Sequence, residues 1–242
     1  MANSSSPVTR TRLHEQVARS LSLQILRREL EPLSLLPNED ELCRQFDVSR
    51  TVIREAIRFM DAKGLVEVRP RIGTRICDPS RWVLTDSVLL KWRIESELEM
   101  GLIKDLVELR SMIEPMAASF AAERASEEEI KAMEAAFKDM EKATNLDEQI
   151  EADIRFHLSI LEACGNELVV SSLRPVIESI LGSVFRRYME FDAAKKSLAV
   201  HGKLFRVIAD RNSEQAMIQM QEMISYAGRD FKEFEKLSQQ KG

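Results

Sequence analysis

Residues 36–77 read LPNEDELCRQFDVSRTVIREAIRFMDAKGLVEVRPRIGTRIC, and this stretch decides the fold of the N-terminal part of the chain. Asn38 is a suitable N-cap for a short helix that reaches Phe46. After a turn, Ser49 can cap a second helix, whose apolar residues recur at helical spacing as far as Lys63. The segment therefore predicts two consecutive helices joined by a short turn.

The residues on both sides of these helices complete the motif. Residues 13–30 carry an apolar stripe at helical spacing, which predicts a helix upstream. Gly64 ends the second helix of the pair, and a strand-like alternation follows at 65–69 and again at 74–77. Helix, helix, turn, helix and two-stranded hairpin is the element order of a winged helix-turn-helix.

Beyond residue 78 nearly every pattern is helical. The chain has only 8 glycines and 7 prolines, and no strand pattern occurs in this part, so the protein is predicted to be mainly α. After a hinge at 78–80, an antiparallel all-α bundle of six or seven helices is the natural way to bury the apolar stripes. The predicted domains are 1–78, with a flexible tail at 1–9, and 79–242. The predicted helices of the second domain cover 86–96, 101–125, 126–143, 146–163, 167–188, 194–211 and 214–237.

The charge is divided unevenly along the chain. Between Arg44 and Arg75 eight basic residues face four acidic ones, so this segment carries +4, and with a net charge of −5 the remainder carries −9. The division indicates a small basic binding surface on an acidic body, although a solvated charged helix face gives the same pattern. Three widely spaced cysteines, a polar N-terminus without the apolar core of a signal peptide and no long apolar run favour a cytoplasmic protein without membrane contact.

Four motifs of the N-terminal segment occur together at fixed spacings. They are residues 36–42 (LPNEDEL), 48–57 (VSRTVIREAI), 64–68 (GLVEV) and 72–74 (IGT). In this combination they closely resemble the winged helix-turn-helix signature of the GntR family of bacterial repressors. The resemblance implies a transcription regulator that binds double-stranded operator DNA and is not an enzyme.

The second helix of the motif would be the recognition helix, whose N-terminal residues reach base edges in the major groove. Arg50 and Arg54 are four residues apart on one face, and either can form a bidentate contact with guanine. The resemblance places the tip of the wing in the minor groove. Asp40 stands where many relatives have an arginine, so that contact is predicted to be missing. The predicted DNA-binding residues are Ser49, Arg50, Thr51, Arg54, Arg71 and Gly73.

A candidate metal site comes from three residues of the second domain. Asp153 and His157 are four apart on a predicted helix, so they project to one face at a spacing that suits two metal ligands. His201 belongs to another helix, which a bundle can fold against the first. Carboxylate and imidazole together suit zinc or another divalent transition ion. The spacing by itself is more often that of a solvated surface pair.

The second domain resembles the FCD sensor domain of the FadR subfamily within the GntR family. The resemblance implies a homodimer and a metal centre at Asp153, His157 and His201, with zinc as the expected ion. Relatives commonly carry a further histidine in the last helix, where this chain has Met223, so either three protein ligands remain or the metal is lost. The motifs that carry the resemblance are Glu108-Leu109-Arg110 with Glu114-Pro115, residues 153–157 (DIRFH), Gly165-Asn166 and His201.

The resemblance also suggests an effector. Residues 89–92 (LLKW) are similar to members that respond to sugar acids, galactonate among them, and a sugar acid can chelate a metal through its carboxylate and a hydroxyl group. Arg110 is predicted to pair with the effector carboxylate in a bidentate fork. Arg229 is a second candidate for this anion, with a solvated surface arginine as the alternative. Tyr188 either lines the effector site or belongs to the core.

Together these features predict an effector-responsive repressor of a sugar-acid catabolic operon. It would bind a palindromic operator as a homodimer and be released by a small carboxylic acid. A regulator that responds to another hydroxy acid, to acyl-coenzyme A or to a metal alone remains an alternative. A metal-dependent hydrolase is the alternative from another class, but the sequence shows no nucleophile motif and no glycine-rich phosphate loop.

Overall fold

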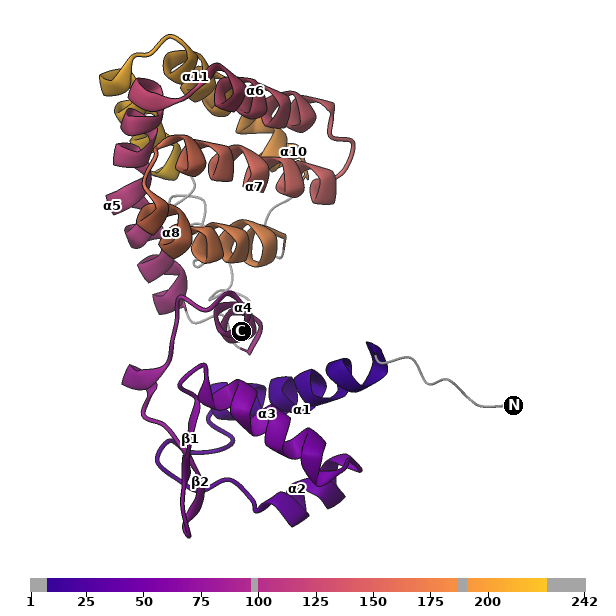
Figure 1. Ribbon diagram of the computed structural model, residues 1–242. Helices are drawn as coiled ribbons and strands as arrows, with labels where there is room; N and C mark the ends of the chain where they lie inside the picture. The colour runs from indigo at the N-terminus through magenta and orange to yellow at the C-terminus, as the bar shows by residue number, and fades with distance from the viewer. Residues whose placement is uncertain (1–7, 97–99, 187–190, 226–242) are drawn as a thin grey trace, which may run out of the picture. The chain divides into compact units, whose positions relative to one another are not determined.

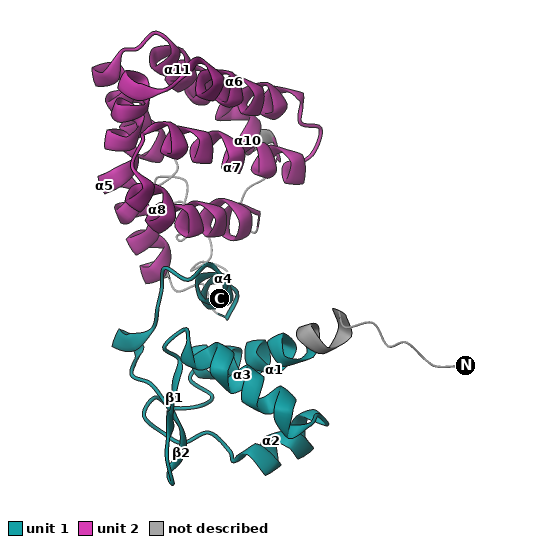
Figure 2. Ribbon diagram, in the orientation of Figure 1, with its two compact units in different colours: residues 1–97 teal, residues 98–242 magenta. Residues whose placement is uncertain are grey.

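The computed structural model describes residues 8–96, 100–186 and 191–225. The chain forms two compact units, an N-terminal unit of residues 1–97 and a C-terminal unit of residues 98–242 (Figure 2). The sequence had placed the domain boundary, and a hinge, at 78–80. In the structure this segment belongs to the N-terminal unit, where the Asp78 carboxylate accepts hydrogen bonds from the backbone N–H and the hydroxyl of Ser80.

The N-terminal unit is the winged helix-turn-helix that the sequence predicted. Its helices and its antiparallel hairpin follow one another in the expected order (Figure 1). Residues 8 and 9, which were assigned to a flexible tail, belong to the first helix, and residues 1–7 lie outside the described residues. The elements are α1 (Val8–Leu26), α2 (Glu39–Phe46), α3 (Arg50–Asp61), β1 (Val66–Arg69), β2 (Gly73–Ile76), η1 (Pro79–Arg81) and α4 (Ser87–Ser96).

Local signals fix the ends of α2 and α3. The Asn38 side chain accepts a hydrogen bond from the Glu41 backbone, and the Glu41 carboxylate accepts one from the Asn38 backbone, which forms a capping box. Asp47 ends α2 in the left-handed conformation, with φ at 51°. Ser49 begins α3, and its side chain forms no capping hydrogen bond. The turn between α2 and α3 is therefore short and sharply defined.

One hydrophobic core joins the four α-helices and the hairpin of this unit. Leu42 from α2, Ile53 from α3 and Ile76 from β2 are fully buried in it. Leu89 and Trp92 of α4 belong to the same core, and α4 packs against α1. This burial is the physical reason that residues 79–97 belong to the N-terminal unit, and the hydrophobic pattern alone could not assign them to either side.

All the elements that the structure describes in the C-terminal unit are helices. α7 lies between α6 and α8, and it also contacts α5 (Figure 1). α11 packs against α5 and α6. Ser126 caps the start of α6 and Asn166 caps the start of α8, and each side chain accepts a hydrogen bond from the backbone of the following turn. The elements are α5 (Met100–Arg124), α6 (Glu127–Lys142), α7 (Leu146–Ala163), α8 (Glu167–Ser179), η2 (Ile180–Phe185), α10 (Phe191–Lys196), α11 (Leu198–Ala209) and a last helix over 213–225.

Two predicted helices differ from those in the structure. The helix expected over 194–211 is interrupted at Ser197, which separates α10 from α11. The Ser197 hydroxyl bonds to the carbonyl of Ala194, so the side chain competes with the helical backbone at this point. After α8 the described chain continues as a π-helix, η2, whose wider turn periodicity analysis cannot predict.

The sequence was expected to contain no apolar run long enough to span a membrane. That expectation was wrong, because one helical stretch has the length and composition to do so. Residues 167–185, which cover α8 and η2, form one helical stretch with a mean hydropathy of 1.5. This stretch packs against α7, and Leu173, Ile177 and Leu181 are buried. Core helices of globular proteins can have the same length and hydropathy, so the stretch is weak evidence for a membrane span.

Gly64 provides the first testable prediction. Its φ is +71°, and a Cβ atom placed on it would lie 2.1 Å from the backbone oxygen of Arg81. We expect Gly64→Ala to lower the free energy of unfolding of the N-terminal unit by at least about 2 kcal/mol, because backbone strain and a clash with backbone add together. Both tryptophans, Trp82 and Trp92, lie in this unit, so urea unfolding followed by tryptophan fluorescence measures the effect.

Gly101→Ala is the control for this experiment. Gly101 lies in α5 of the other unit, and nothing lies within 4 Å of the position that its Cβ would take. It should leave the fluorescence transition unchanged. Equal transitions for Gly64→Ala and the wild-type protein would show that the chain around Arg81 can move away without cost.

Candidate functional site

The N-terminus of α3 presents the side chains that the sequence assigned to DNA. Ser49, Arg50, Thr51 and Arg54 are all exposed. The opposite face of the helix, which includes Ile53, Ala56 and Ile57, is buried in the core. Because Ser49 makes no capping bond, its hydroxyl is available to a phosphate. The arrangement has the form of a recognition helix, while the role of each side chain remains a prediction.

Both arginines of this surface are held by acidic residues of α2, which the sequence did not reveal. Arg50 Nη2 lies 2.7 Å from the carboxylate of Asp40. Arg54 Nε lies 3.0 Å from the carboxylate of Glu39. Asp40, noted in the sequence only as a missing basic contact, is thus an ion-pair partner of a candidate base-reading residue. All four side chains are solvated, so these pairs orient the arginines more than they stabilise the fold.

The hairpin forms the wing. β1 and β2 are antiparallel, with Arg69 opposite Gly73. The turn between them includes Arg71 at φ +65°, and β2 begins at Gly73 with φ +120°. The side chain of Arg71 is exposed and has no polar partner among the described residues. Arg75, by contrast, donates to the backbone carbonyl of Leu33, which ties β2 to the preceding loop. Arg71 is therefore the wing arginine that is free to meet a phosphate.

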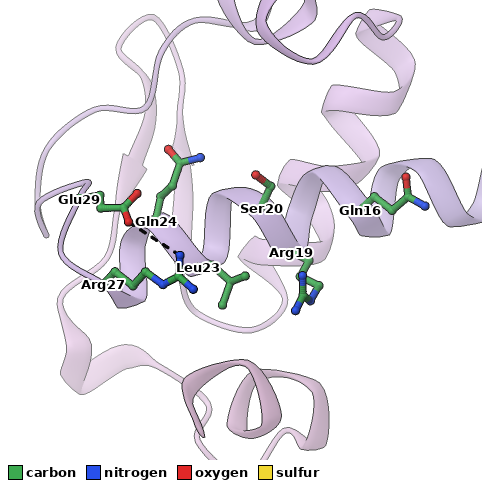
Figure 3. A pocket seen from close by; sticks show the side chains of 7 residues that line it. All are labelled: Gln16, Arg19, Ser20, Leu23, Gln24, Arg27 and Glu29. Carbon is green, nitrogen blue, oxygen red and sulfur yellow. Dashed lines mark ion pairs between the residues drawn. The ribbon is translucent and has the colours of Figure 1, made fainter. Parts of the chain in front are cut away.

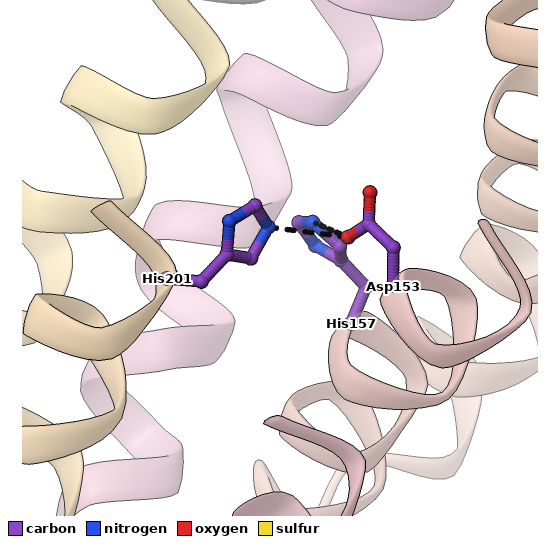
Figure 4. A group of neighbouring side chains, drawn as sticks. All are labelled: Asp153, His157 and His201. Carbon is purple, nitrogen blue, oxygen red and sulfur yellow. Dashed lines mark hydrogen bonds and ion pairs between the residues drawn. The ribbon is translucent and has the colours of Figure 1, made fainter. Parts of the chain in front are cut away.

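A buried cluster lies inside the C-terminal unit. Asp153 and His157 project from α7, and His201 projects toward them from α11 (Figure 4). Nε2 of His201 lies 3.1 Å, and Nε2 of His157 3.4 Å, from the same oxygen, Oδ1 of Asp153. Their ligand atoms all lie within 4.8 Å of one another, and all three side chains are buried. The predicted triad is brought together, and the reading of Asp153 and His157 as a solvated pair is wrong.

The second nitrogen of each histidine is held from outside the triad. Nδ1 of His157 lies 3.0 Å from the carboxylate of Glu114 on α5. Nδ1 of His201 lies 2.8 Å from the backbone carbonyl of Ser197, at the break between α10 and α11. An acceptor at Nδ1 keeps the proton there and leaves Nε2 as a lone pair directed at the centre of the triad. The donor set therefore fits a divalent metal ion.

Arg110 does not face an open site as the sequence suggested. It is buried on α5, and its guanidinium is forked onto Glu114, with an Nε–Oε1 contact and an Nη2–Oε2 distance of 3.2 Å. Nη2 also lies 3.5 Å from Nδ1 of His157. Arg110 and Glu114 thus form a buried ion pair directly behind His157, in which the charge of the guanidinium is balanced by that of the carboxylate.

The charges of the cluster shift each other's pKa values. Burial alone would raise the pKa of Glu114, but the charge of Arg110 and the contact with His157 outweigh it and lower the pKa to about 2. Burial would likewise raise the pKa of Asp153, yet His201 lowers it overall. Burial lowers and Asp153 raises the pKa of His201, with a net increase. Without a metal, a proton on His201 is favoured.

Some predicted residues are not part of this arrangement. Tyr188 and Arg229, assigned to the effector, lie outside the described residues. Met223 is buried in the core cluster of the C-terminal unit, in the last helix. Glu114 was quoted only as part of a motif and not as a site residue. Its spacing of four from Arg110 on one helix was the signal that could have identified the pair.

A groove of about 340 Å³ runs along α1 in the N-terminal unit (Figure 3). Its arginines are partly engaged, since Arg19 pairs with Glu95 and Arg27 donates to the carbonyl of Ser96. Most of the side chains that line the groove are polar, and none of its residues was predicted to be functional. The residues that line it are Gln16, Arg19, Ser20, Leu23, Gln24, Arg27 and Glu29.

Comparisons with known proteins agree with both parts of the structure. The model of bacterial regulatory proteins of the gntR family matches residues 13–76, and the FCD domain model matches residues 105–226. The galactonate operon transcriptional repressor of Escherichia coli K12 is 33% identical over 223 residues, which cover 90% of this chain and 96% of that protein. The chain belongs to the GntR family. It is a transcription regulator with an FCD domain, and not an enzyme.

A second sequence relative and a solved structure are also similar to this chain. The Uxu operon transcriptional regulator of Escherichia coli is 32% identical over 177 residues, which cover 70% of this chain and 65% of that protein. Among solved structures, Lar of Listeria monocytogenes gives a TM-score of 0.65 at 19% identity and covers 91% of this chain and 96% of the other. That structural likeness shows the fold alone.

Glu114 provides the second testable prediction. Glu114→Gln leaves the buried guanidinium of Arg110 without its counter-charge, so we expect a loss of about 3–5 kcal/mol in the free energy of unfolding. The pKa of Glu114 is lowered to about 2 in the folded protein, so its contribution is present above pH about 4.5 and is lost as the pH falls toward 2. Unfolding followed by far-ultraviolet circular dichroism at several pH values measures both effects.

Glu108→Gln is the matched control, because Glu108 lies on the same helix with 61% of its side chain exposed. It should change the free energy of unfolding by no more than about 0.5 kcal/mol. A Glu114→Gln protein as stable as this control, with the same acid sensitivity as the wild type, would show that the buried pair does not stabilise the unit.

Proposed function

We propose that this protein is a repressor of a sugar-acid operon and senses a galactonate-like acid at a metal ion held by Asp153, His157 and His201. It binds a palindromic operator in the bacterial cytoplasm as a homodimer and releases it when the acid binds. The observation that carries the proposal is the buried triad, with Nδ1 of both histidines occupied and Nε2 of both directed inward.

The charge of the site supports an anionic effector. A histidine that binds a metal through nitrogen is neutral, so a divalent ion would displace the proton that His201 otherwise favours. Arg110 and Glu114 cancel each other, and Asp153 offsets one of the two charges of the ion. The metal-bound cluster would carry a net charge of +1 in a buried setting, and a monocarboxylate neutralises it. An acid with a hydroxyl next to its carboxylate can also chelate the ion.

Zinc is the ion that we propose. Two imidazole nitrogens and one carboxylate oxygen are a common zinc ligand set, which leaves the fourth position to water or another ligand. Met223 offers a thioether, which is a poor ligand for zinc, so the open position remains available. The carboxylate of Glu114 on Nδ1 of His157 orients the ring, as acidic groups do behind zinc-bound histidines.

The similarity to sugar-acid regulators supports the biological role. One relative is named for the galactonate operon and another for the Uxu operon, and both are curated as transcriptional regulators. Winged helix-turn-helix proteins read two half-sites one helical turn apart as two-fold dimers, which supports a homodimer on a palindrome. An effector that binds one arrangement of the dimer better than the other shifts the equilibrium away from the DNA-bound state.

The DNA-binding residues provide the third testable prediction. We expect Arg50→Ala and Arg54→Ala each to weaken binding to an operator fragment, selected from random sequence by the wild-type protein, by about tenfold to a hundredfold, because each loses a bidentate base contact. Arg58→Ala is the matched control, since Arg58 is exposed at the other end of the same helix. Unchanged affinity of both variants in a gel-shift assay, at a stated salt concentration, would show that another element reads the operator.

The metal and the acid provide the fourth testable prediction. Galactonate at a hundred times its Kd should stabilise the zinc-loaded protein by about 2.7 kcal/mol, measured as a rise in the thermal unfolding midpoint. The rise should vanish after treatment with a chelator. Zinc affinity should fall as the pH drops through the raised pKa of His201, because protons compete for Nε2.

A comparison of Asp153→Asn with Asp147→Asn distinguishes the loss of a metal ligand from the loss of a negative charge on the same helix. Asp153→Asn removes a ligand and should abolish zinc binding, whereas Asp147 lies on the same helix with 70% of its side chain exposed and should be neutral. Stabilisation by galactonate that survives the chelator would remove the metal from the proposal. An acid that tightens operator binding would reverse the sign of the regulation.

A further inference from the structure

Gln149 is a buried polar side chain without a partner. It lies in the first turns of α7, and only 2% of its surface is exposed. Within the part of the chain that the structure describes, neither its side-chain nitrogen nor its side-chain oxygen forms a hydrogen bond. Burial of an unpaired amide loses the hydrogen bonds that water would form with each of its groups, so such a residue in a native protein requires an explanation.

The position of Gln149 relates it to the triad. Gln149, Asp153 and His157 follow one another at intervals of four residues, so they lie on one side of α7. Gln149 is one turn, or about 6 Å along the helix axis, from Asp153. The amide is therefore separated from the metal-binding carboxylate by a distance comparable with the length of an extended six-carbon acid.

We infer that Gln149 binds the hydroxyl groups of the effector, and that the protein therefore selects a polyhydroxylated acid of about six carbons over a shorter one. This inference rests on the proposed function. An amide offers donors and an acceptor side by side, and a hydroxyl group both donates and accepts, so two neighbouring hydroxyls can satisfy both ends of the amide. A simple fatty acid would leave the amide unpaired, and a site with unpaired polar groups rejects such a ligand.

Gln149→Leu tests the inference, because leucine has a similar size and no polar atoms. We expect the affinity of the zinc-loaded protein for galactonate, measured by titration calorimetry, to fall at least about tenfold. Zinc affinity should stay unchanged, since none of the three ligands is altered. The unliganded variant should unfold at the same temperature as the wild type or higher, because an unpaired buried amide has been removed. Gln215→Leu, at an exposed position of the same unit, is the matched control and should change none of these values.

The other outcomes overturn the inference in distinguishable ways. Unchanged galactonate affinity together with a lower unfolding temperature would show that Gln149 serves the fold. A parallel loss of zinc affinity would place its action at the metal. A wild-type protein that binds glycolate but not galactonate would remove the hydroxyl contacts while the sensing of a carboxylic acid stands. A wild-type protein that binds zinc and no acid would overturn the proposed function together with the inference.

Discussion

Ionised carboxylates inside a helical bundle constrain the C-terminal unit more than any other groups do. Glu114 and Asp153 are both buried, and an unpaired ion in such a place costs several kcal/mol. Glu114 on α5 pairs with Arg110 of the same helix and with His157 of α7. Asp153 on α7 pairs with His201 of α11. Helices α5, α7 and α11 are thereby fixed relative to one another, because a shift of any one would leave a charge without its partner.

This constraint also explains why the structure breaks a helix where the sequence pattern continues. Because the helix is interrupted at Ser197, α11 begins at the next residue. The carbonyl of Ser197, just before this start, lies against Nδ1 of His201. Gly202 follows at once, and a Cβ there would lie 2.9 Å from the ring of Phe137 on α6. The glycine thus lets α11 approach α6 closely enough for His201 to reach Asp153. The same close approach of α11 to α6 therefore serves both the packing of the apolar helix and the geometry of the polar cluster.

The sequence predicted the winged unit well because its signals are local. The N-cap at Asn38 and the alternation at 65–69 each act within a few residues, and the structure has the cap and the strand there. Asp153 and His157 were paired by a spacing of four on one helix, which is a local relation, but His201 lies on a distant helix, and only the resemblance to the FCD domain favoured a metal site over a solvated pair. What could not be predicted depends on distant elements: the ion pairs of Arg50 and Arg54, the burial of Gln149 and the place of α4. A polar residue such as Gln149 in a helix is indistinguishable from a surface residue until its neighbours are known.

The acidic partners of the recognition arginines bear on specificity. An arginine that must leave Asp40 or Glu39 to meet a phosphate exchanges one solvated ion pair for another, so it gains little from random DNA. A guanine edge offers two acceptors to one guanidinium in a fixed geometry, and this gain is not cancelled by the loss of the ion pair. The same acids hold the guanidinium groups beside the exposed face of α3. We therefore expect Asp40, a departure from the common basic residue, to lower affinity for arbitrary sequences and to leave the discrimination between bases intact.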